Sequence, residues 1–265
     1  MTITPSWYFI GLARDARVGA APRQSVVADR LLTLRRGQDG EARAELAGVS
    51  LPVCEYGPTL LAWLGGGEPR FSVPSFSCAG WLPMRWFHVD LHTRPELVMR
   101  DLADIEHFET VHGYAQIEVE QALAYEGSAC TMKMAFGWDV GFAGLYIPSR
   151  LRSRVDGLGV QRTEVESLGG RLTSRHLVMP TPRLGGVTRV HAGYSVRLTD
   201  EGPLARAEAE VLLRYLGRSY RRDLERDAQL WRGESSHRPT RRQAMDDYQR
   251  WVDSLGQASA QARAS

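Results

Sequence analysis

Two histidines and several carboxylates lie close together in residues 104–112, DIEHFETVH. Imidazole nitrogens bind iron, zinc or copper, and a carboxylate commonly completes such a ligand set. Asp104 precedes His107 by three residues, so on a helix both side chains point to the same side. Asp104 is then placed to accept a hydrogen bond from the imidazole and to orient it. The run therefore has the residue types that a transition-metal site needs.

The spacing of the two histidines restricts how they can meet. His107 and His112 are about 140° apart around a regular α-helix, so both reach one ion only if the helix distorts or ends near Val111. Gly113 supplies a stop, because glycine adopts the left-handed conformation that closes many helices. On spacing alone, two histidines near a helix end are more often surface or cap-like residues than ligands. Asp227, far along the chain in ERDAQLW, is unremarkable by itself.

Two helical segments would position these residues. Residues 95–112 have Pro95 at a suitable first position and apolar residues at helical spacing. Residues 204–233 repeat apolar side chains at intervals of four or seven, which predicts one long amphipathic helix eased at Gly217. A second, shorter helix is predicted over residues 241–255.

The rest of the chain is rich in strand patterns. Residues 6–75 have the pattern of about four short strands, too few for an independent core, so they are expected to pack against the remainder of the chain. Residues 72–86 form a connector broken by prolines. A strand over residues 87–94 and further strand patterns within residues 114–200 predict a large antiparallel sheet, with a variable loop at residues 139–150.

Composition indicates an ordinary soluble globular protein of 265 residues with a net charge of +2. No apolar run is long enough to span a membrane and the start lacks a signal-peptide pattern, so a cytoplasmic location is expected. The three cysteines form no C-x-x-C pair and are expected to be inert thiols. Arginines are spread along the chain and matched by 31 acidic residues, which does not favour nucleic-acid binding.

Three segments resemble one enzyme family. DLADIEHFETVH resembles the D-x-x-H-x4-H segment of the catalytic domain of Rieske non-haem iron oxygenases, and is most similar to the branch with 3-ketosteroid 9α-hydroxylase and the cholesterol 7-desaturases. RRDLERDAQLW resembles that branch's helix R-x-D-x-x-Q-D-x-x-x-W. WYFIGLARDARVG resembles the opening of a Rieske domain. The similarity spans much of residues 6–253.

The resemblance implies a ligand set and a fold. His107, His112 and Asp227 would hold iron(II), and Asp104 would be the carboxylate that, in the family, bridges a ligand histidine to the Rieske centre of a neighbouring subunit. The implied fold is α+β. Residues 1–75 would be a truncated, degenerate Rieske-like all-β domain, residues 76–255 an antiparallel-sheet catalytic domain of the helix-grip type, and residues 256–265 a disordered tail.

The chain also departs from the family pattern. Arg100 and Asp101 stand where Glu-Asn is usual, and Arg226 stands where the pattern has Gln. A Rieske cluster needs C-x-H and C-x-x-H, but the cysteines here are followed by Glu-Tyr, Ala-Gly and Thr-Met. No cluster of that kind is expected in this chain, so the electrons must come from elsewhere.

The leading hypothesis is a catalytic subunit that oxidises a hydrophobic small molecule with O2. It would receive electrons from a Rieske-bearing homologue or a reductase, in a hetero-oligomer of three plus three subunits. The expected reaction is hydroxylation, desaturation, demethylation or oxidative cyclisation. Two alternatives are a non-catalytic scaffold subunit with vestigial ligands and a helix-grip protein that binds a hydrophobic ligand without chemistry. Four aromatic residues are candidates for the pocket wall: Tyr114, Phe136, Phe142 and Tyr146.

Overall fold

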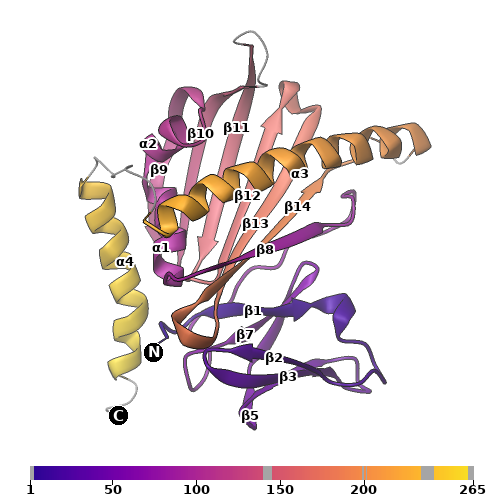
Figure 1. Ribbon diagram of the computed structural model, residues 1–265, viewed down its shortest axis with the longest axis vertical. Coiled ribbons are helices and arrows are strands. Elements are labelled where there is room, and N and C mark those ends of the chain that lie inside the picture. Colours follow the sequence, from indigo (N-terminus) through magenta and orange to yellow (C-terminus); the bar gives the residue numbers. More distant parts are fainter. Residues whose placement is uncertain (1–2, 140–144, 199, 201, 234–241, 262–265) are drawn as a thin grey trace.

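A seven-stranded antiparallel sheet crossed by one long helix dominates the computed structural model, and two smaller sheets lie beside one end of it (Figure 1). The structure describes residues 3–139, 145–198, 200, 202–233 and 242–261. The large sheet has the order β8-β14-β13-β12-β11-β10-β9, with every neighbouring pair antiparallel. The predicted large antiparallel sheet is confirmed.

The strands of the large sheet are long, as a sheet that supports a cavity requires. Their bounds are β8 (Arg85–Leu91), β9 (Ala115–Glu126), β10 (Ala129–Asp139), β11 (Tyr146–Asp156), β12 (Val160–Ser167), β13 (Leu172–Pro182) and β14 (Thr188–Val196). Strand β11 is not among the predicted strands, because its sequence has the pattern of a loop and turn. Its arginines at 150, 152 and 154 alternate with buried Leu151, Ser153 and Val155, so it is a half-buried strand with a strongly basic outer face.

The N-terminal region contains more strands than the sequence pattern predicts. Sheet β1-β7-β6 and sheet β2-β3-β4-β5 comprise β1 (Trp7–Leu12), β2 (Arg23–Val27), β3 (Arg30–Arg36), β4 (Ala42–Leu46), β5 (Val49–Leu51), β6 (Val53–Tyr56) and β7 (Thr59–Trp63). The run that has the pattern of one strand is a hairpin, since Ala28 and Asp29 adopt φ of 51° and 63° in a tight turn. A similar turn at Ala47 and Gly48 separates β4 from β5.

These N-terminal sheets pack directly on the large sheet, as their small size predicts. One apolar cluster combines Trp7, Phe9 and Trp63 with Leu177 and Met179 of β13. The polar contacts run between the same elements: the Leu158 amide donates to Ser6 Oγ at 2.9 Å, and Thr181 Oγ1 donates to the Phe9 carbonyl at 3.1 Å. Residues 64–84 form the connector between the small sheets and β8.

The segment predicted as one helix is interrupted. It consists of α1 (Pro95–Arg100), the 3-10 turn η2 (Asp101–Ala103) and α2 (Ile105–Thr110), with Asp104 in extended backbone conformation between the last two. Other 3-10 turns are η1 (Ala13–Asp15), η3 (Leu168–Gly170) and η4 (Leu184–Gly186). The interruption ends the first helical stretch and starts the short helix that carries His107, and apolar residues on both sides of Asp104 pack in the same cluster.

Helix α3 (Pro203–Trp231) is continuous across the sheet. Gly217 does not ease the helix as predicted. It permits close approach instead, because a Cβ at this position would lie 2.3 Å from the Tyr194 hydroxyl oxygen. Helix α4 (Arg242–Gln261) extends beyond the predicted helix into residues expected to be a tail, because alanine and glutamine favour helix. Residues 262–265 lie outside the described residues.

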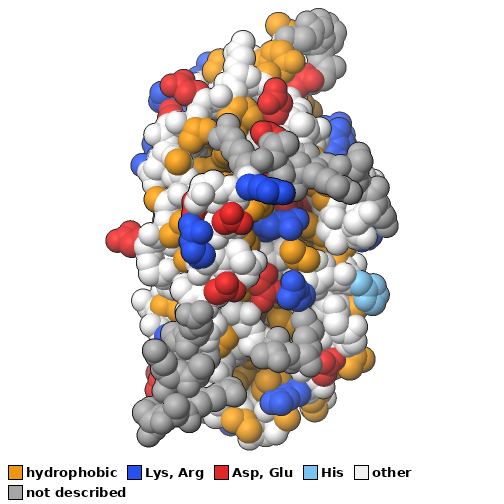
Figure 2. All heavy atoms as spheres, turned by 90° about the vertical axis from the view of Figure 1, so that its left-hand side faces the viewer, with side chains coloured by type: hydrophobic (Ala, Val, Ile, Leu, Met, Phe, Trp, Pro, Cys, Tyr) orange, Lys and Arg blue, Asp and Glu red, His pale blue; other side chains and the backbone are white. Residues whose placement is uncertain are grey.

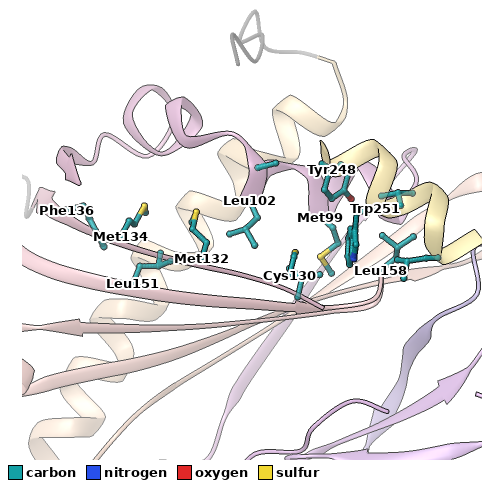
Figure 3. Close-up of a cluster of buried hydrophobic side chains, with 14 residues drawn as sticks. Met99, Leu102, Cys130, Met132, Met134, Phe136, Leu151, Leu158, Tyr248 and Trp251 are labelled. Atoms are coloured by element: carbon teal, nitrogen blue, oxygen red, sulfur yellow. The ribbon is translucent and has the colours of Figure 1, made fainter. Parts of the chain in front are cut away.

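Helices α1 and α4 cover the β10 side of the sheet (Figure 3). Tyr248 and Trp251 of α4 pack with Met99, Cys130 and Met132 in one apolar cluster. Trp251 Nε1 donates to the Gly127 carbonyl at 3.0 Å, and the Tyr248 hydroxyl donates to the Glu96 carbonyl at 2.5 Å. These contacts fix the helical cover at one end of the sheet, while α3 covers the other.

Acidic and basic side chains are interspersed on the face that carries α4 (Figure 2), which is the charge distribution of an ordinary solvated surface. Among the described residues, no helix has both the length and the apolar character that crossing a bilayer requires.

Candidate metal centre and its cavity

The end of α2 brings its two histidines together by closing abruptly. The Val111 amide bonds to the His107 carbonyl at 2.9 Å, and the Tyr114 amide reaches back to the Phe108 carbonyl at 3.0 Å. That second bond spans one residue more than a usual helix-closing bond. Gly113 makes it possible with φ of 72°. The predicted helix end near Val111 is confirmed, and it removes the angular separation that a regular helix would impose.

Helix α3 presents one polar and aromatic face to these histidines. Tyr220, Asp223, Asp227 and Trp231 all line the same cavity. Their spacings of three and four residues place them on one side of the helix. Asp227 is therefore positioned by a rigid helix that crosses the sheet, whereas the histidines are positioned by a short helix and its closing turn.

Three ligand-type atoms converge between these elements. His107 Nε2 lies 2.9 Å from His112 Nε2 and 3.0 Å from Asp227 Oδ1, and His112 Nε2 lies 3.2 Å from the same oxygen. The side chains are 3%, 8% and 16% exposed for His107, His112 and Asp227. The structure thus brings together all three residues predicted as ligands, and their donor atoms could hold one metal ion.

The donor set fits a metal ion. Asp227 Oδ1 is buried and receives no hydrogen bond from the described residues, although two ring nitrogens lie within 3.2 Å of it. Ligands that bind one ion at about 2.1 Å and at right angles lie about 3.0 Å apart, close to the separations here. Two imidazoles and one carboxylate on one face match the triad that binds non-haem iron(II).

The charges of the three groups are mutually dependent. Burial opposes protonation of His112, but Asp227 and Asp223 outweigh it and raise the pKa of His112 to about 10. Burial likewise opposes ionisation of Asp227, but the two imidazoles lower its pKa to about 2. In the metal-free protein the site therefore holds a carboxylate and a protonated imidazole. A cation bound at this point would replace that proton.

Asp104 occupies the junction that precedes the first histidine. It is the N-cap residue of α2, and its side chain is buried, with 4% of the residue exposed. The Asp104 carbonyl accepts the His107 amide at 3.2 Å, so the backbone couples the two residues. A buried carboxylate beside a predicted ligand histidine would have an orienting role, and both roles stay predictions.

The departures from the family pattern form contacts around the site. Asp101 Oδ2 accepts the indole hydrogen of Trp231 at 2.7 Å, and Asp101 lines the cavity. Arg226 Nη1 donates to the Val111 carbonyl at 3.1 Å, where α2 closes. Both residues therefore connect the histidine-bearing segment to α3.

Replacing Asp101 by asparagine is expected to make stability less dependent on pH. Burial raises the pKa of Asp101 to about 6, so its contribution is fully present below about pH 4 and is lost as pH rises through about 6. Asparagine cannot ionise, yet its amide oxygen can still accept from Trp231. We compare the free energy of unfolding of the metal-free Asp101→Asn variant with that of wild type. As pH rises from 4 to 7.5, this difference should shift in favour of the variant by about 1–2 kcal/mol. Urea unfolding with a chelator measures this; a difference independent of pH would contradict it.

The cavity beside the three atoms measures about 150 Å³, which is room for about five water molecules. Tyr114 and Phe136 line it, as predicted, and their rings stack with centroids 4.2 Å apart. Tyr146, the first residue of β11, does not line the cavity and is 45% exposed. Phe142 lies outside the described residues.

The polar side of this cavity was not predicted from the sequence. Gln161 and Thr163 of β12, Ser174 and His176 of β13, and Asp223 of α3 all line it. Asp223 Oδ1 lies 3.9 Å from His112 Nδ1. Asp223 belongs to the quoted R-x-D motif, four residues before Asp227, and that spacing could have indicated it. Nothing in the sequence distinguishes inward-facing positions on β12 and β13 from the opposite face.

Solved structures share this fold along nearly the whole chain. Dicamba monooxygenase with non-heme iron and dicamba is 14% identical with a TM-score of 0.63, covering 98% of this chain and 99% of that one. The NdmA QL mutant of Pseudomonas putida CBB5 with theobromine is 10% identical, with a TM-score of 0.61 and coverage of 96% and 91%. The quaternary ammonium Rieske monooxygenase CntA is 10% identical, with a TM-score of 0.59 and coverage of 96% and 89%. At these identities the likeness shows the fold.

Comparison with family models gives a more specific result than the solved structures do. No curated protein matches the chain. A family model described as the 3-ketosteroid 9alpha-hydroxylase C-terminal domain matches residues 64–246, which is well over half of the chain and includes the two histidines and Asp227. The large sheet, α1, α2 and α3 fall within that match. The chain therefore belongs to the 3-ketosteroid 9alpha-hydroxylase C-terminal domain family.

Proposed function

We propose that this protein is a mononuclear non-haem iron oxygenase subunit that oxidises a small molecule with O2. The observation that supports this most directly is the convergence of His107 Nε2, His112 Nε2 and Asp227 Oδ1, 2.9–3.2 Å apart, at the wall of a cavity. These residues would hold iron(II). When bound, it would supply the redox chemistry that joins O2 to oxidation of the substrate.

The protein's own residues would bind the substrate, orient the metal ligands and shield the site from bulk water. The stacked rings of Phe108, Tyr114 and Phe136 form an apolar wall beside the histidines, which limits the access of bulk water. Asp223 faces His112 from α3, and Asp104 precedes His107 at the N-cap of α2. Carboxylates in such positions hold ligand imidazoles in a fixed orientation and raise their basicity.

The electrons would come from another chain. The sequence contains no C-x-H or C-x-x-H pair, and a Rieske cluster requires both. In this proposal residues 1–75 are a Rieske-like domain without its redox centre, and residues 76–255 form a helix-grip catalytic domain. A homologous Rieske-bearing subunit or a reductase would dock so that its cluster approaches Asp104, in an assembly of three plus three subunits.

Reconstitution with such a partner tests the proposal. The purified full chain is expected to bind one iron(II) per chain under anaerobic conditions, measured by metal analysis after desalting. The partner to add is a Rieske-bearing oxygenase subunit, and genes that neighbour this one are the first place to look for it. Oxidised product should then form only when this chain, the partner and a reductase are all present, as followed by O2 uptake and mass spectrometry.

Each result that contradicts the proposal points to a different alternative function. A complex that turns over equally well after iron has been stripped from this chain would indicate a scaffold subunit. Stoichiometric binding of a small molecule without iron binding would indicate a ligand-binding protein. Turnover with a generic chemical reductant alone would remove the need for a dedicated electron-donating partner.

A further inference from the structure

The outer side of helix α3 carries a line of arginines that faces solvent. Four of them follow one another at intervals of four residues and a fifth lies beside them: Arg214, Arg218, Arg222 and Arg226, with Arg221. Residues four apart on a helix project to the same side. All five are exposed, and no other described element lies over the outer side of α3 in Figure 1. We refer to these five residues as the arginine ridge.

Few carboxylates of the same helix offset the charge of the ridge. Asp223 and Asp227 line the cavity on the inner side of α3. Glu210 forms an ion pair with Arg85 of β8, with 3.4 Å between nitrogen and oxygen. Glu225 is the exposed carboxylate that stands within the ridge. The ridge therefore has a strong net positive charge.

Each step along the ridge also places like charges next to each other. Arg214, Arg218 and Arg222 stand four residues apart, and like-charged pairs at this spacing destabilise a helix. Within the described part of the chain, ion pairs and hydrogen bonds engage the Arg226 side chain but none of these three. The repulsion stabilises nothing inside the fold, whereas carboxylates of another molecule would relieve it.

Exposed apolar side chains continue the ridge toward the start of α3. Val211 is 64% exposed and Tyr215 is 47% exposed, and they lie seven and three residues before Arg218, on the same side of the helix. The Tyr215 ring packs beside Trp138, with centroids 6.0 Å apart. Tyrosine and arginine are enriched in protein interfaces, and exposed apolar side chains do not improve solubility. The combination is typical of a surface that binds another protein.

The ridge lies on the helix that also contributes to the metal site. The inner side of α3 presents Asp223 and Asp227 to the cavity, and a helix with its side chains is about 10–12 Å across. Arg226 Nη1 donates to the Val111 carbonyl at 3.1 Å, so the ridge ends at the segment that carries Asp104 and the two histidines. A protein that binds the ridge would lie about one helix width from the triad.

We propose that the arginine ridge, together with Val211 and Tyr215, is the docking surface for the electron-donating protein, and that this donor presents an acidic face. The inference rests on the proposed function, which requires electrons from another chain. It deepens that function by naming the surface that binds the donor and the charge of the donor's face. Duplex DNA and an anionic membrane would match the same charge, but neither has a reason to lie beside the metal site.

A defined acidic redox protein tests the docking without turnover. The probe is a plant-type [2Fe–2S] ferredoxin with a strongly negative net charge, and its binding to the full chain is measured by biolayer interferometry, which requires neither iron nor substrate. We expect binding at about 50 mM salt that weakens about tenfold or more at about 300 mM, because salt screens charge pairs at the rim of an interface.

Two triple variants assign the binding to the ridge. Arg214→Gln/Arg218→Gln/Arg222→Gln should bind ferredoxin at least about tenfold more weakly, since glutamine keeps the helix propensity and removes three charges. The matched control is Arg30→Gln/Arg70→Gln/Arg152→Gln, which removes the same charge from exposed positions outside α3 and should bind like wild type. Arg152 belongs to the basic outer face of β11, so the control also tests that second basic surface.

A single charge reversal separates docking from stability. Arg218→Glu places a carboxylate four residues from Arg214 and from Arg222, where opposite charges stabilise a helix. This variant should unfold at a higher urea concentration than wild type and yet bind ferredoxin at least about tenfold more weakly. A charge that serves only the fold would not give this combination. Its iron binding should equal that of wild type, since the ligands are unchanged.

Four results would overturn the inference. They are no ferredoxin binding at low salt, equal weakening in the control triple variant, ridge-dependent binding of phosphatidylglycerol vesicles or duplex DNA that is tighter than that of ferredoxin, and self-association in sedimentation that the ridge variant abolishes. Failure of the oxygenase proposal has a different signature, because a chain that holds no iron would still bind ferredoxin through the ridge.

Discussion

Alanine in place of Asp227 is expected to abolish both iron binding and turnover. Asp227 Oδ1 lies within 3.2 Å of both ring nitrogens, and its removal leaves two neutral donors for a doubly charged ion. Loss of a residue that only orients a ligand costs about 10–100-fold in metal affinity, so loss of a ligand should exceed about 100-fold. Metal analysis after desalting should find iron in wild type and essentially none in Asp227→Ala.

A control on the same helix separates the loss of a ligand from the loss of a charge. Glu225 lies two residues from Asp227 and is exposed, so Glu225→Ala removes one carboxylate from α3 and leaves the site intact. It should bind iron and support turnover like wild type. His107→Ala should behave like Asp227→Ala. If the reconstituted complex kept full activity with His107→Ala, the triad would be vestigial and the scaffold interpretation would lead.

The grouping of His107, His112 and Asp227 could be predicted because the signals in the sequence are either local or part of a recognisable motif. His107 and His112 lie on either side of a helix end that Gly113 marks, and the structure closes the helix there. Asp227 sits in a motif on a predictable amphipathic helix. The distance between that helix and the histidines could not be predicted, because it depends on how α3 crosses the sheet.

The polar side of the cavity, which includes His176, could not be predicted because it depends on strand register. Whether His176 faces the cavity or the N-terminal sheets depends on the register of β13 against β12 and β14, and a shift by one residue reverses every side chain. His191, on the neighbouring strand, shows the other outcome: it packs against Phe9 with ring centroids 4.2 Å apart. Two histidines in similar strand patterns thus have unrelated surroundings.

Two remaining differences have separate causes, one in a local turn and one in tertiary packing. The hairpin at Ala28 and Asp29 uses non-glycine residues with positive φ, so no glycine marks it in the sequence. Asp104 interrupts a helical pattern in which the apolar spacing continues unbroken. The interruption is a tertiary effect, since the apolar residues on either side pack against the sheet while Asp104 is buried beside His107.

Replacing Gly159 by alanine is expected to destabilise the whole protein strongly. A Cβ at this position would lie 1.9 Å from the Trp7 carbonyl oxygen and 2.9 Å from its carbonyl carbon. Both are backbone atoms of β1, so no side-chain rotation relieves the contact. Strand β1 would have to move away from β12, which opens the apolar cluster that contains Trp7 and Val160. We expect a loss of about 3 kcal/mol or more in the free energy of unfolding.

The shape of the unfolding curve then tests how the N-terminal sheets relate to the catalytic sheet. If the two share one core, as the contacts of Trp7 indicate, urea unfolding of Gly159→Ala should show one transition at lower urea. Two transitions would mean that the small sheets detach alone. Gly256→Ala is the control, because nothing lies within 4 Å of a Cβ there and alanine should stabilise α4 by about 0.5–1 kcal/mol. Below its transition Gly159→Ala should still bind iron, since the ligands stand on α2, its closing turn and α3, not on β1.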